Sequence, residues 1–329
     1  MKANWRLWLG IGLSLVCLCL VVRGIDPDEV RTALSGVNYF WLFPSAAAGV
    51  VSVWFKALRW RLLFLPRTGL RTGKLFSITM IGYVINSVLP ARLGDPARAV
   101  LVGEMGGAPT AQALATVVIE RLLDVLTLLV FLVALMPFIG MPDWLWRSAF
   151  VVGLAAVGGF VGLLLIGRRR DRLVPALTRL LRPLPVLGSG AIAKQLDHLL
   201  SGMDAFGSPG NSAMIAFYCL VIWVLSVSQN YFVQLGFALP VPATAAVLVC
   251  IVNVLGMLIP SSPGYIGVFH YLTVLTLGLF AVDPSVALSY AIVLHLTIFV
   301  PLVAAGLLAL WRESLSFAKV SARAARLEQ

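Results

Sequence analysis

The chain has 329 residues, of which 60% are hydrophobic and 12% are charged, and its mean hydropathy is +0.96. Soluble domains carry about a quarter charged residues, so this composition excludes a soluble catalytic domain and indicates a lipid environment. The net charge of +11 could suggest nucleic-acid binding, but the basic residues gather beside the ends of apolar runs, as they do in membrane proteins. We therefore expect no nucleic-acid partner.

Apolar runs follow one another along the whole chain. A transmembrane helix needs about 20 apolar residues to cross roughly 30 Å of hydrocarbon. The runs cover residues 7–22, 39–65, 75–90, 113–137, 144–167, 212–239, 243–260, 264–282 and 285–311. We expect an all-α, polytopic helical membrane protein. Its first run should be an uncleaved span, because Arg23-Gly24-Ile25-Asp26 offers no small-residue cleavage site.

Basic clusters predict the orientation of these spans. They lie at the end of the second run, after the fifth run and at the end of the chain: Lys56, Arg59, Arg61, Arg67, Arg71 and Lys74; Arg168, Arg169, Arg170, Arg172, Arg179 and Arg182; Arg312, Lys319, Arg323 and Arg326. The segments 138–146 and 237–243 carry almost no basic charge. Because loops rich in Lys and Arg stay in the cytoplasm, we expect both termini there, in a bacterial inner membrane.

This orientation leaves two apolar segments that cannot be complete spans. Lys74 and the region from Arg92 to Arg98 must both lie inside, so the run 75–90 should enter from the cytoplasm and return. The segment 243–282 must begin and end outside for the same reason. We therefore expect two re-entrant, broken helices that enter the membrane from opposite faces.

A weak internal similarity suggests that these segments belong to an inverted repeat. Leu89-Pro90-Ala91-Arg92-Leu93-Gly94 matches Ile259-Pro260-Ser261-Ser262-Pro263-Gly264. Because Pro breaks helices and Gly permits tight turns, the expected hinge residues are Pro90, Gly94, Pro260, Pro263, Gly264 and Gly267. Inverted repeats with broken helices are typical of transporters. The alternative is that both motifs mark ordinary loops at the membrane edge.

The predicted organisation is a single membrane domain over residues 1–329. It comprises a first span with an outer loop (1–38), repeat 1 (39–137), a connecting span (138–167), a cytoplasmic linker (168–211), repeat 2 (212–311) and a cytoplasmic tail (312–329). Apolar residues recur at helical spacing among basic ones over 172–206, which predicts two amphipathic helices on the cytoplasmic membrane surface. An ordinary linker is the alternative.

Polar and charged residues within these segments mark a candidate binding site. A charge at the bilayer centre costs roughly 2.5–3.5 kcal/mol on insertion scales, so such residues should face the protein interior and pair. The candidate substrate-binding residues are Asn86, Arg92, Asp95, Arg98, Glu120, Arg121, Asp124, Asn253, Ser261, Ser262, Tyr265 and His270. These groups either line a site or form a purely structural ion-pair network.

One helix face concentrates the acidic residues. Glu120 and Asp124 share a face with Thr116 and Thr127, and Arg121 can reach Asp124 one turn along. We expect this face to find its cationic partners in the arginines of the first broken segment, Arg92 and Arg98. The second repeat is mostly neutral, and its residues His270 and His295 are interpreted as packing or hydrogen-bonding groups.

No enzymatic activity, cofactor or metal is expected. The chain has no nucleophile–base pair, phosphate-binding loop or metal-ligand spacing that we recognise. Its four cysteines lie in apolar runs, and we interpret them as buried hydrophobic residues: Cys17, Cys19, Cys219 and Cys250.

Three motifs make nearly the whole chain resemble the flippase-like family named after the transmembrane region of lysylphosphatidylglycerol synthase (MprF-like proteins). They are Asn86-Ser-Val-Leu-Pro90-Ala-Arg92-Leu-Gly94-Asp95-Pro-Ala-Arg98, Glu120-Arg121-Leu-Leu-Asp124 and Pro260-Ser-Ser-Pro263-Gly264-Tyr-Ile-Gly267. The resemblance implies a translocase for lipids such as aminoacylated phospholipids, polyprenyl-linked sugars or hopanoid-type lipids.

Two residues depart from the family pattern, since Asp95 stands where Glu is more usual and His270 where an acidic residue is expected. The chain ends at Gln329 without a soluble synthase domain, so the resemblance does not extend to aminoacyl transfer.

The favoured function is a lipid flippase that handles an anionic or zwitterionic headgroup. The alternatives are a proton- or cation-coupled secondary transporter of a small solute, and a non-transporting scaffold that recruits a lipid-modifying enzyme. The expected partners are therefore a membrane lipid and an enzyme that synthesises or modifies it.

Overall fold

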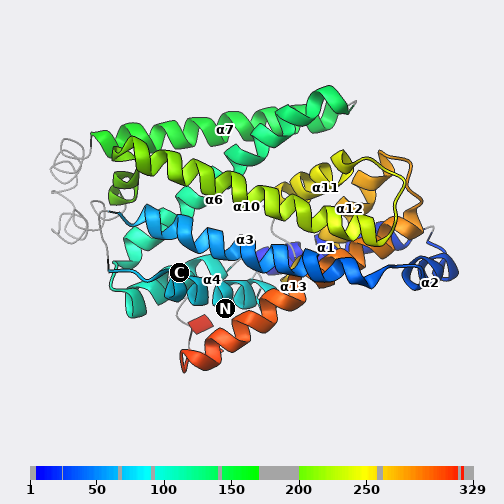
Figure 1. Ribbon diagram of the computed structural model, residues 1–329, viewed down its shortest axis with the longest axis horizontal. Helices are drawn as coiled ribbons and strands as arrows, with labels where there is room; N and C mark the ends of the chain where they lie inside the picture. The colour runs from blue at the N-terminus through cyan, green and yellow to red at the C-terminus, as the bar shows by residue number, and fades with distance from the viewer. Residues whose placement is uncertain are drawn as a thin grey trace.

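The computed structural model is all-α and describes residues 5–23, 25–65, 69–89, 93–139, 143–169, 200–257, 262–317 and 320–321 (Figure 1). Its α-helices are α1 (Trp5–Val22), α2 (Pro27–Ser35), α3 (Leu42–Leu63), α4 (Thr72–Val88), α5 (Gly94–Leu101), α6 (Thr110–Leu135), α7 (Asp143–Arg168), α10 (Pro209–Gly236), α11 (Ala243–Gly256), α12 (Val268–Gly278) and α13 (Pro284–Arg312). Short 3-10 turns are η1 (Tyr39–Trp41), η3 (Met136–Phe138), η4 (Ser201–Gly207) and η5 (Pro263–Tyr265), and η2 (Val102–Gly106) is a π-helix.

Helix length and hydropathy confirm a polytopic membrane protein. Four described helices are long and apolar enough to cross a bilayer: Tyr39–Leu63, Trp146–Arg168, Pro209–Gly236 and Pro284–Arg312. The α1–α2 pair, bent by 86°, gives a fifth candidate. Helix α6 has 26 residues and extends over roughly 39 Å at 1.5 Å per residue, but it carries three charges within its length.

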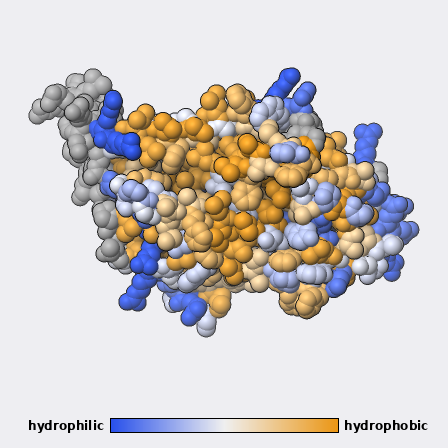
Figure 2. Space-filling model, turned by 45° about the horizontal axis from the view of Figure 1, so that its top comes forward, coloured by the Kyte–Doolittle hydropathy of each residue, from blue (hydrophilic) through white to orange (hydrophobic). Residues whose placement is uncertain are grey.

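The surface agrees with a lipid environment. Figure 2 shows a broad hydrophobic band across the body, with hydrophilic side chains gathered towards its two ends. Large apolar side chains such as Phe150 and Leu154 on α7 and Phe217 on α10 are exposed in this band. Soluble monomers rarely expose contiguous apolar surface of this extent, so this band is the one that lipid tails would cover.

Helices α3 and α10 pack side by side through the centre of the molecule (Figure 1). Gly49 of α3 lies against Gln229 of α10, where a Cβ atom would come within 3.1 Å of the Gln229 side-chain carbonyl carbon. Ser45 Oγ also donates a hydrogen bond to the Gln229 carbonyl oxygen at 2.8 Å. Small residues let helix backbones approach closely in membranes, which accounts for this central pair.

Helices α4 and α5 form a helical hairpin. The Gly94 amide donates to Asn86 Oδ1 at 2.7 Å, which joins the end of α4 to the start of α5. A Cβ atom on Gly94 would overlap the Gly82 carbonyl oxygen, so the two helices meet here without a side chain between them. The close approach requires glycine at position 94.

Helices α11 and α12 form a second hairpin. Asn253 Nδ2 donates to Thr273 Oγ1 at 2.8 Å between them, and Gly256 lies against Leu272. The turn between the helices contains Gly264 and Gly267, with φ angles of 66° and 94°. Positive φ angles favour glycine, which accounts for glycine at both positions; their role as hinges stays a prediction.

The turn of the second hairpin meets the end of α4. In Figure 1, α4 lies in the left half of the molecule and α11 and α12 in the right half. The η5 turn packs against α4, so that a Cβ atom on Gly264 would lie 3.5 Å from the Ser87 carbonyl oxygen. His295 on α13 secures this turn, because its Nε2 atom is 2.8 Å from the Gly264 carbonyl oxygen.

Several predictions concern residues that the structure does not describe. Pro90 and Pro260, predicted as hinges, lie outside the described residues, as does most of the segment 172–206 predicted to form amphipathic helices. The interpretation of the cysteines needs one correction. Cys17, Cys219 and Cys250 are buried as expected, but Cys19 is exposed, because it lies on the outward face of α1.

Candidate functional site

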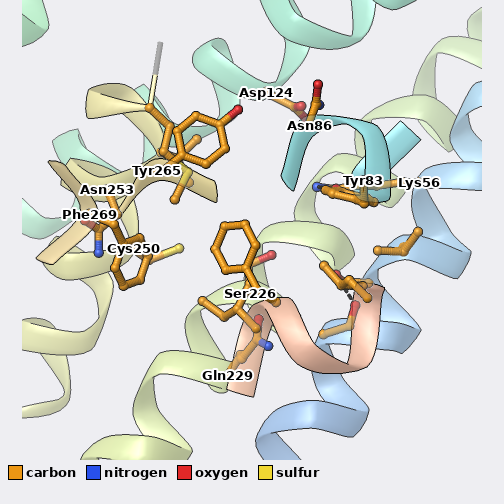
Figure 3. Close-up of a pocket in the computed structure, with 18 of the residues that line it drawn as sticks. Lys56, Tyr83, Asn86, Asp124, Ser226, Gln229, Cys250, Asn253, Tyr265 and Phe269 are labelled. Atoms are coloured by element: carbon orange, nitrogen blue, oxygen red, sulfur yellow. Dashed lines mark hydrogen bonds between the residues drawn. The ribbon is translucent and has the colours of Figure 1, made fainter. Parts of the chain in front are cut away.

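A pocket of about 190 Å³ lies where the described residues of the two hairpins meet the central helices. Figure 3 shows side chains from both hairpins and from the long helices converging on it. Its polar lining residues are Ser52, Lys56, Tyr83, Asn86, Ser87, Asp95, Arg121, Asp124, Ser226, Gln229, Asn230, Asn253 and Tyr265. An apolar cavity of about 150 Å³ holds benzene, so this pocket has room for one small polar group.

The pocket lies about halfway along the long helices. Its lining residues include Ser52 and Lys56 of α3, Asp124 of α6, Ser226 of α10 and Ile298 of α13. Each is near the middle of a helix that is long enough, or nearly long enough, to cross a bilayer. The hairpin residues in the lining come from the second half of α4, the start of α5, α11, the η5 turn and the start of α12.

A buried ion-pair network forms one wall of the site. Arg59 of α3 binds Asp124 of α6 with 2.8 Å between Nη1 and Oδ1, and its Nη2 atom is 3.8 Å from Glu120 Oε1. Arg98 of α5 binds the other oxygen of Glu120, with 2.8 Å between Nη2 and Oε2. Arg59 is 1% exposed, and all four side chains are buried. Paired charges of this kind connect three helices within the membrane interior.

The network extends to the pocket through Arg121. Its guanidinium binds both carboxylate oxygens of Asp95, with Nε–Oδ2 and Nη2–Oδ1 distances of 3.1 and 2.6 Å. Its Nη1 atom is 3.7 Å from Asp124 Oδ2, and its side chain is 39% exposed. This fork-to-fork geometry fixes the start of α5 against α6 and brings both groups to the pocket wall.

Local packing holds Arg98 in place. A Cβ atom at Gly82 would lie 2.7 Å from Arg98 Cγ, so the absence of a side chain in α4 leaves room for the arginine stem. The Arg98 guanidinium carbon lies 4.0 Å from the Trp60 ring centroid, within cation–π distance. Trp60 is fixed in turn, because its indole N–H donates to Thr116 Oγ1 at 2.9 Å.

Lys56 is a pocket residue outside this network. Its Nζ donates to the Tyr83 hydroxyl at 3.0 Å and lies 5.7 Å from the ring centroids of Tyr83 and Trp223. Figure 3 shows Lys56 and Tyr83 together on one side of the pocket, opposite Tyr265 and Asn253. The ammonium group therefore contacts a hydroxyl and aromatic rings from α4 and α10.

The structure brings six of the predicted substrate-binding residues into the pocket lining: Asn86, Asp95, Arg121, Asp124, Asn253 and Tyr265. Arg98 and Glu120 are paired with each other behind the wall. Ser262 lies away from the pocket, where its amide donates to Ser14 Oγ at 2.9 Å. Arg92 and Ser261 lie outside the described residues.

The predicted acidic face of α6 is confirmed in part and its partners need correction. Thr116, Glu120, Asp124 and Thr127 are all buried, and Arg98 is a partner as expected. The partner of Asp124, however, is Arg59, which the sequence analysis placed in a cytoplasmic basic cluster. Lys56 was placed in the same cluster and lines the pocket instead. Both residues lie inside α3, where helical geometry turns them towards α4 and α6.

The spacing within α3 contains a signal that points to these two residues. Gly49, Ser52, Lys56 and Arg59 follow one another at intervals of three and four residues, which places small, polar and basic side chains on one helix face. The positive-inside rule treats a basic residue near a span end as a loop charge, whereas this periodicity indicates an inward face.

His270 and His295 form a contact that the sequence did not predict. Their ring centroids are 5.1 Å apart, although the residues lie on α12 and α13. His295 also stacks on Phe299 at 4.2 Å, and Phe269 contacts both histidines edge-on. His295 thus packs and hydrogen-bonds, whereas His270 packs with its Nδ1 atom buried and without a hydrogen-bond partner among the described residues. His270, which was predicted to bind substrate, is not among the residues that line the pocket.

Comparisons with known proteins identify relatives. The family model described as the lysylphosphatidylglycerol synthase TM region matches residues 7–306. Glycosyltransferase AglD of Haloferax volcanii is 26% identical over 323 residues, covering 87% of this chain and 51% of that protein. A UPF0104 membrane protein of Methanothermobacter thermautotrophicus is 21% identical over 316 residues, covering 91% and 93% of the two chains. This chain spans about half the length of the glycosyltransferase, and no solved structure gives a significant match.

Proposed function

Because this chain belongs to the family of the lysylphosphatidylglycerol synthase transmembrane region, we propose that it moves a membrane lipid between leaflets. The lipid headgroup would occupy the pocket between the two hairpins, while the apolar tails stay in the bilayer. The proposed lipid carries an anionic or zwitterionic headgroup. No chemical step on the lipid is part of this proposal.

The position of the pocket is the observation that carries the proposal. Polar and charged side chains such as Lys56, Asp95 and Asp124 stand among its apolar lining residues, yet it lies halfway along helices whose outer surfaces are apolar (Figure 2). Polar groups at membrane depth are expensive unless they face the protein interior or a cavity. A cavity that presents charged and polar side chains at this depth supports the passage of a polar group through the bilayer centre.

We further propose that the hairpins are re-entrant and belong to an inverted repeat. Helix α4 of the first hairpin packs on α13, and helix α11 of the second packs on α6, so each hairpin contacts the last span of the other unit. The corresponding spans α3 and α10 pack on each other. This reciprocal pattern is what a two-fold relation between two units would produce.

The proposed orientation places the ends of α3, α7 and α13 in the cytoplasm. Basic residues occupy the last turns of these helices, at Arg61, Arg168 and Arg312. Figure 1 shows these three ends towards the same side of the molecule. By the positive-inside rule, this side is cytoplasmic, and the first hairpin enters from it.

Pairing of the acidic residues favours lipid translocation over proton-coupled transport of a solute. Asp95, Glu120 and Asp124 each form an ion pair with an arginine. A carboxylate held in this way is a poor proton carrier, because protonation would leave an arginine unpaired in the membrane interior.

We propose that a lipid-modifying enzyme supplies the substrate, which fits the glycosyltransferase name of one relative.

Pocket blockade tests the proposed function. Purified protein is reconstituted into liposomes that contain a fluorescent phosphatidylcholine, phosphatidylglycerol or phosphatidic acid, and outer-leaflet probe is bleached with dithionite over time. Ser226→Trp places an indole in the pocket, whereas Val224→Trp places the same side chain on the outward face of α10, where Val224 is exposed. Both variants therefore introduce the same indole side chain, but only Ser226→Trp reduces the volume of the pocket.

We expect wild type and Val224→Trp to accelerate inward or outward movement of at least one probe, and Ser226→Trp to move it no faster than protein-free liposomes do. Thermal unfolding and gel filtration establish that all three proteins are folded. Folded wild type that moves none of the probes would refute the proposal. Equal activity of Ser226→Trp and Val224→Trp would show that the lipid headgroup does not pass through the pocket.

A further inference from the structure

The charges around the pocket are nearly balanced. Among the described residues, the network contains three guanidinium groups and three carboxylates: Arg59, Arg98 and Arg121, and Asp95, Glu120 and Asp124. Every one of these groups has an ion-pair partner within the set. The charges of the described residues in this network therefore balance, and each of these three arginines is paired with a carboxylate of the protein.

Lys56 adds one positive charge to this neutral surrounding. No described carboxylate forms an ion pair with its ammonium group, whose hydrogen bond goes to the Tyr83 hydroxyl. An ammonium group has three N–H donors, and the tyrosine accepts one. The other donors remain available at the pocket wall. The ammonium group carries a single charge at membrane depth, where a charge is costly unless it is paired.

We infer that Lys56 recognises a single negative charge on the lipid headgroup, and that this charge is a phosphodiester. This inference rests on the proposed function. A phosphodiester carries one negative charge, which balances one ammonium group, whereas a phosphomonoester carries between one and two at neutral pH. A neutral headgroup would leave Lys56 without an ion-pair partner within contact distance among the described residues.

The pocket has the size and the donors for such a group. Its volume of about 190 Å³ accommodates a phosphate with its nearest substituents. Asn86 faces the pocket beside Lys56 and uses its Oδ1 atom to accept from the Gly94 amide. Its side-chain N–H₂ group is thereby directed to other acceptors, so phosphate oxygens would meet an amide as well as an ammonium donor.

Binding of short-chain lipids tests the role of Lys56 separately from translocation. The probes are dihexanoyl phosphatidylglycerol, a phosphodiester, and dihexanoylglycerol, which has the same tails without phosphate. Their affinities for purified protein in dodecyl maltoside are measured by titration calorimetry. Lys56→Met preserves the shape of the side chain and removes its charge, and Arg61→Met removes an exposed charge from the same helix.

We expect Lys56→Met to weaken phosphatidylglycerol binding by about tenfold to about a hundredfold, as loss of a hydrogen bond to a charged group does. Arg61→Met should bind as wild type does. Lys56→Arg, which keeps the charge, should bind more tightly than Lys56→Met. Tyr83→Phe should have a smaller effect than Lys56→Met, because the ammonium group remains. Dihexanoylglycerol should bind all variants equally.

Two further probes identify the source of the phosphate. Glycerophosphoglycerol carries the same phosphodiester without tails, and inorganic phosphate carries no organic substituent. Both should bind far more weakly than the lipid. If either binds as tightly, the ligand is a soluble phosphate compound and the lipid assignment is wrong. Unchanged phosphatidylglycerol affinity in folded Lys56→Met would overturn the inference.

Binding and transport failures remain distinguishable. Lys56-dependent binding in a wild-type protein that moves no lipid would contradict the proposed function and leave the recognition site in place. Lipid movement that is blocked by Ser226→Trp, combined with unaltered binding in Lys56→Met, would support the proposed function and overturn the role of Lys56.

Discussion

Loss of the Arg59 guanidinium should strongly destabilise the fold. Arg59 is 1% exposed and binds Asp124 at 2.8 Å, with Glu120 at 3.8 Å and Cys219 Sγ at 3.2 Å from the guanidinium. At an effective dielectric constant of about 20, opposite unit charges separated by 2.8 Å attract each other by roughly 6 kcal/mol. Removing the guanidinium also removes its own desolvation penalty, which offsets part of this loss.

The expected cost of Arg59→Met is therefore about 3–5 kcal/mol, the range for breaking one side of a buried pair. Asp124→Asn should cost a similar amount, because it leaves Arg59 without its nearest carboxylate. The double variant should be less destabilised than the sum of the two by at least about 2 kcal/mol, since each single variant leaves one charge without its nearest counter-ion and the double variant removes both charges.

Unfolding with sodium dodecyl sulfate in maltoside micelles measures these free energies through tryptophan fluorescence. Arg61→Met is the matched control, because Arg61 lies two residues further along α3, is exposed and has no ion pair among the described residues; it should change stability by less than about 0.5 kcal/mol. Additive losses in the double variant, or a loss for Arg59→Met no larger than that for Arg61→Met, would refute the assignment of a coupled buried pair.

Three other outcomes are expected. Gly94→Ala should destabilise the protein by about 1–3 kcal/mol in the same unfolding assay, because its Cβ overlaps the α4 backbone, whereas Gly73→Ala, whose Cβ meets nothing within 4 Å, should cause no loss. Gly306→Ala should destabilise by a similar amount where α13 crosses α4, and stability equal to that of Gly73→Ala would contradict the close packing. Single cysteines at Gly69 and Glu104, in a chain whose own cysteines are replaced, should react with an impermeant maleimide from the same side of the membrane; opposite-side labelling would make α4 a complete span.

The helices of this fold could be predicted from the sequence because their signal is local. Apolar runs separated by Pro, Gly and basic residues match the observed elements closely, as with the run 285–311 and helix α13 (Pro284–Arg312). The acidic face of α6 was predictable for the same reason, since helical periodicity alone brings Glu120 and Asp124 together. Local patterns also located the breaks in the two hairpins.

The partners of these charges depend on packing between distant segments. Asp95 and Arg121 meet because α5 folds back along α4 and then packs on α6, and nothing in either motif fixes that arrangement. Arg59 was misplaced because a basic residue near the end of an apolar run gives the same sequence signal whether it faces a loop or the interior. Helix orientation decides between the two, and it is set by the long contact between α3 and α10.

Under the proposed function, the balance of positive and negative groups among the described residues of the ion-pair network determines how the membrane potential acts on this protein. Moving equal numbers of positive and negative groups together through the field requires no electrical work. A pocket that holds Lys56 with a bound phosphodiester is neutral as well. The empty pocket carries one charge, and moving that charge across the full field corresponds to about 2.3 kcal/mol per 100 mV. The voltage would therefore leave the loaded step unaffected and act on the return of the empty protein.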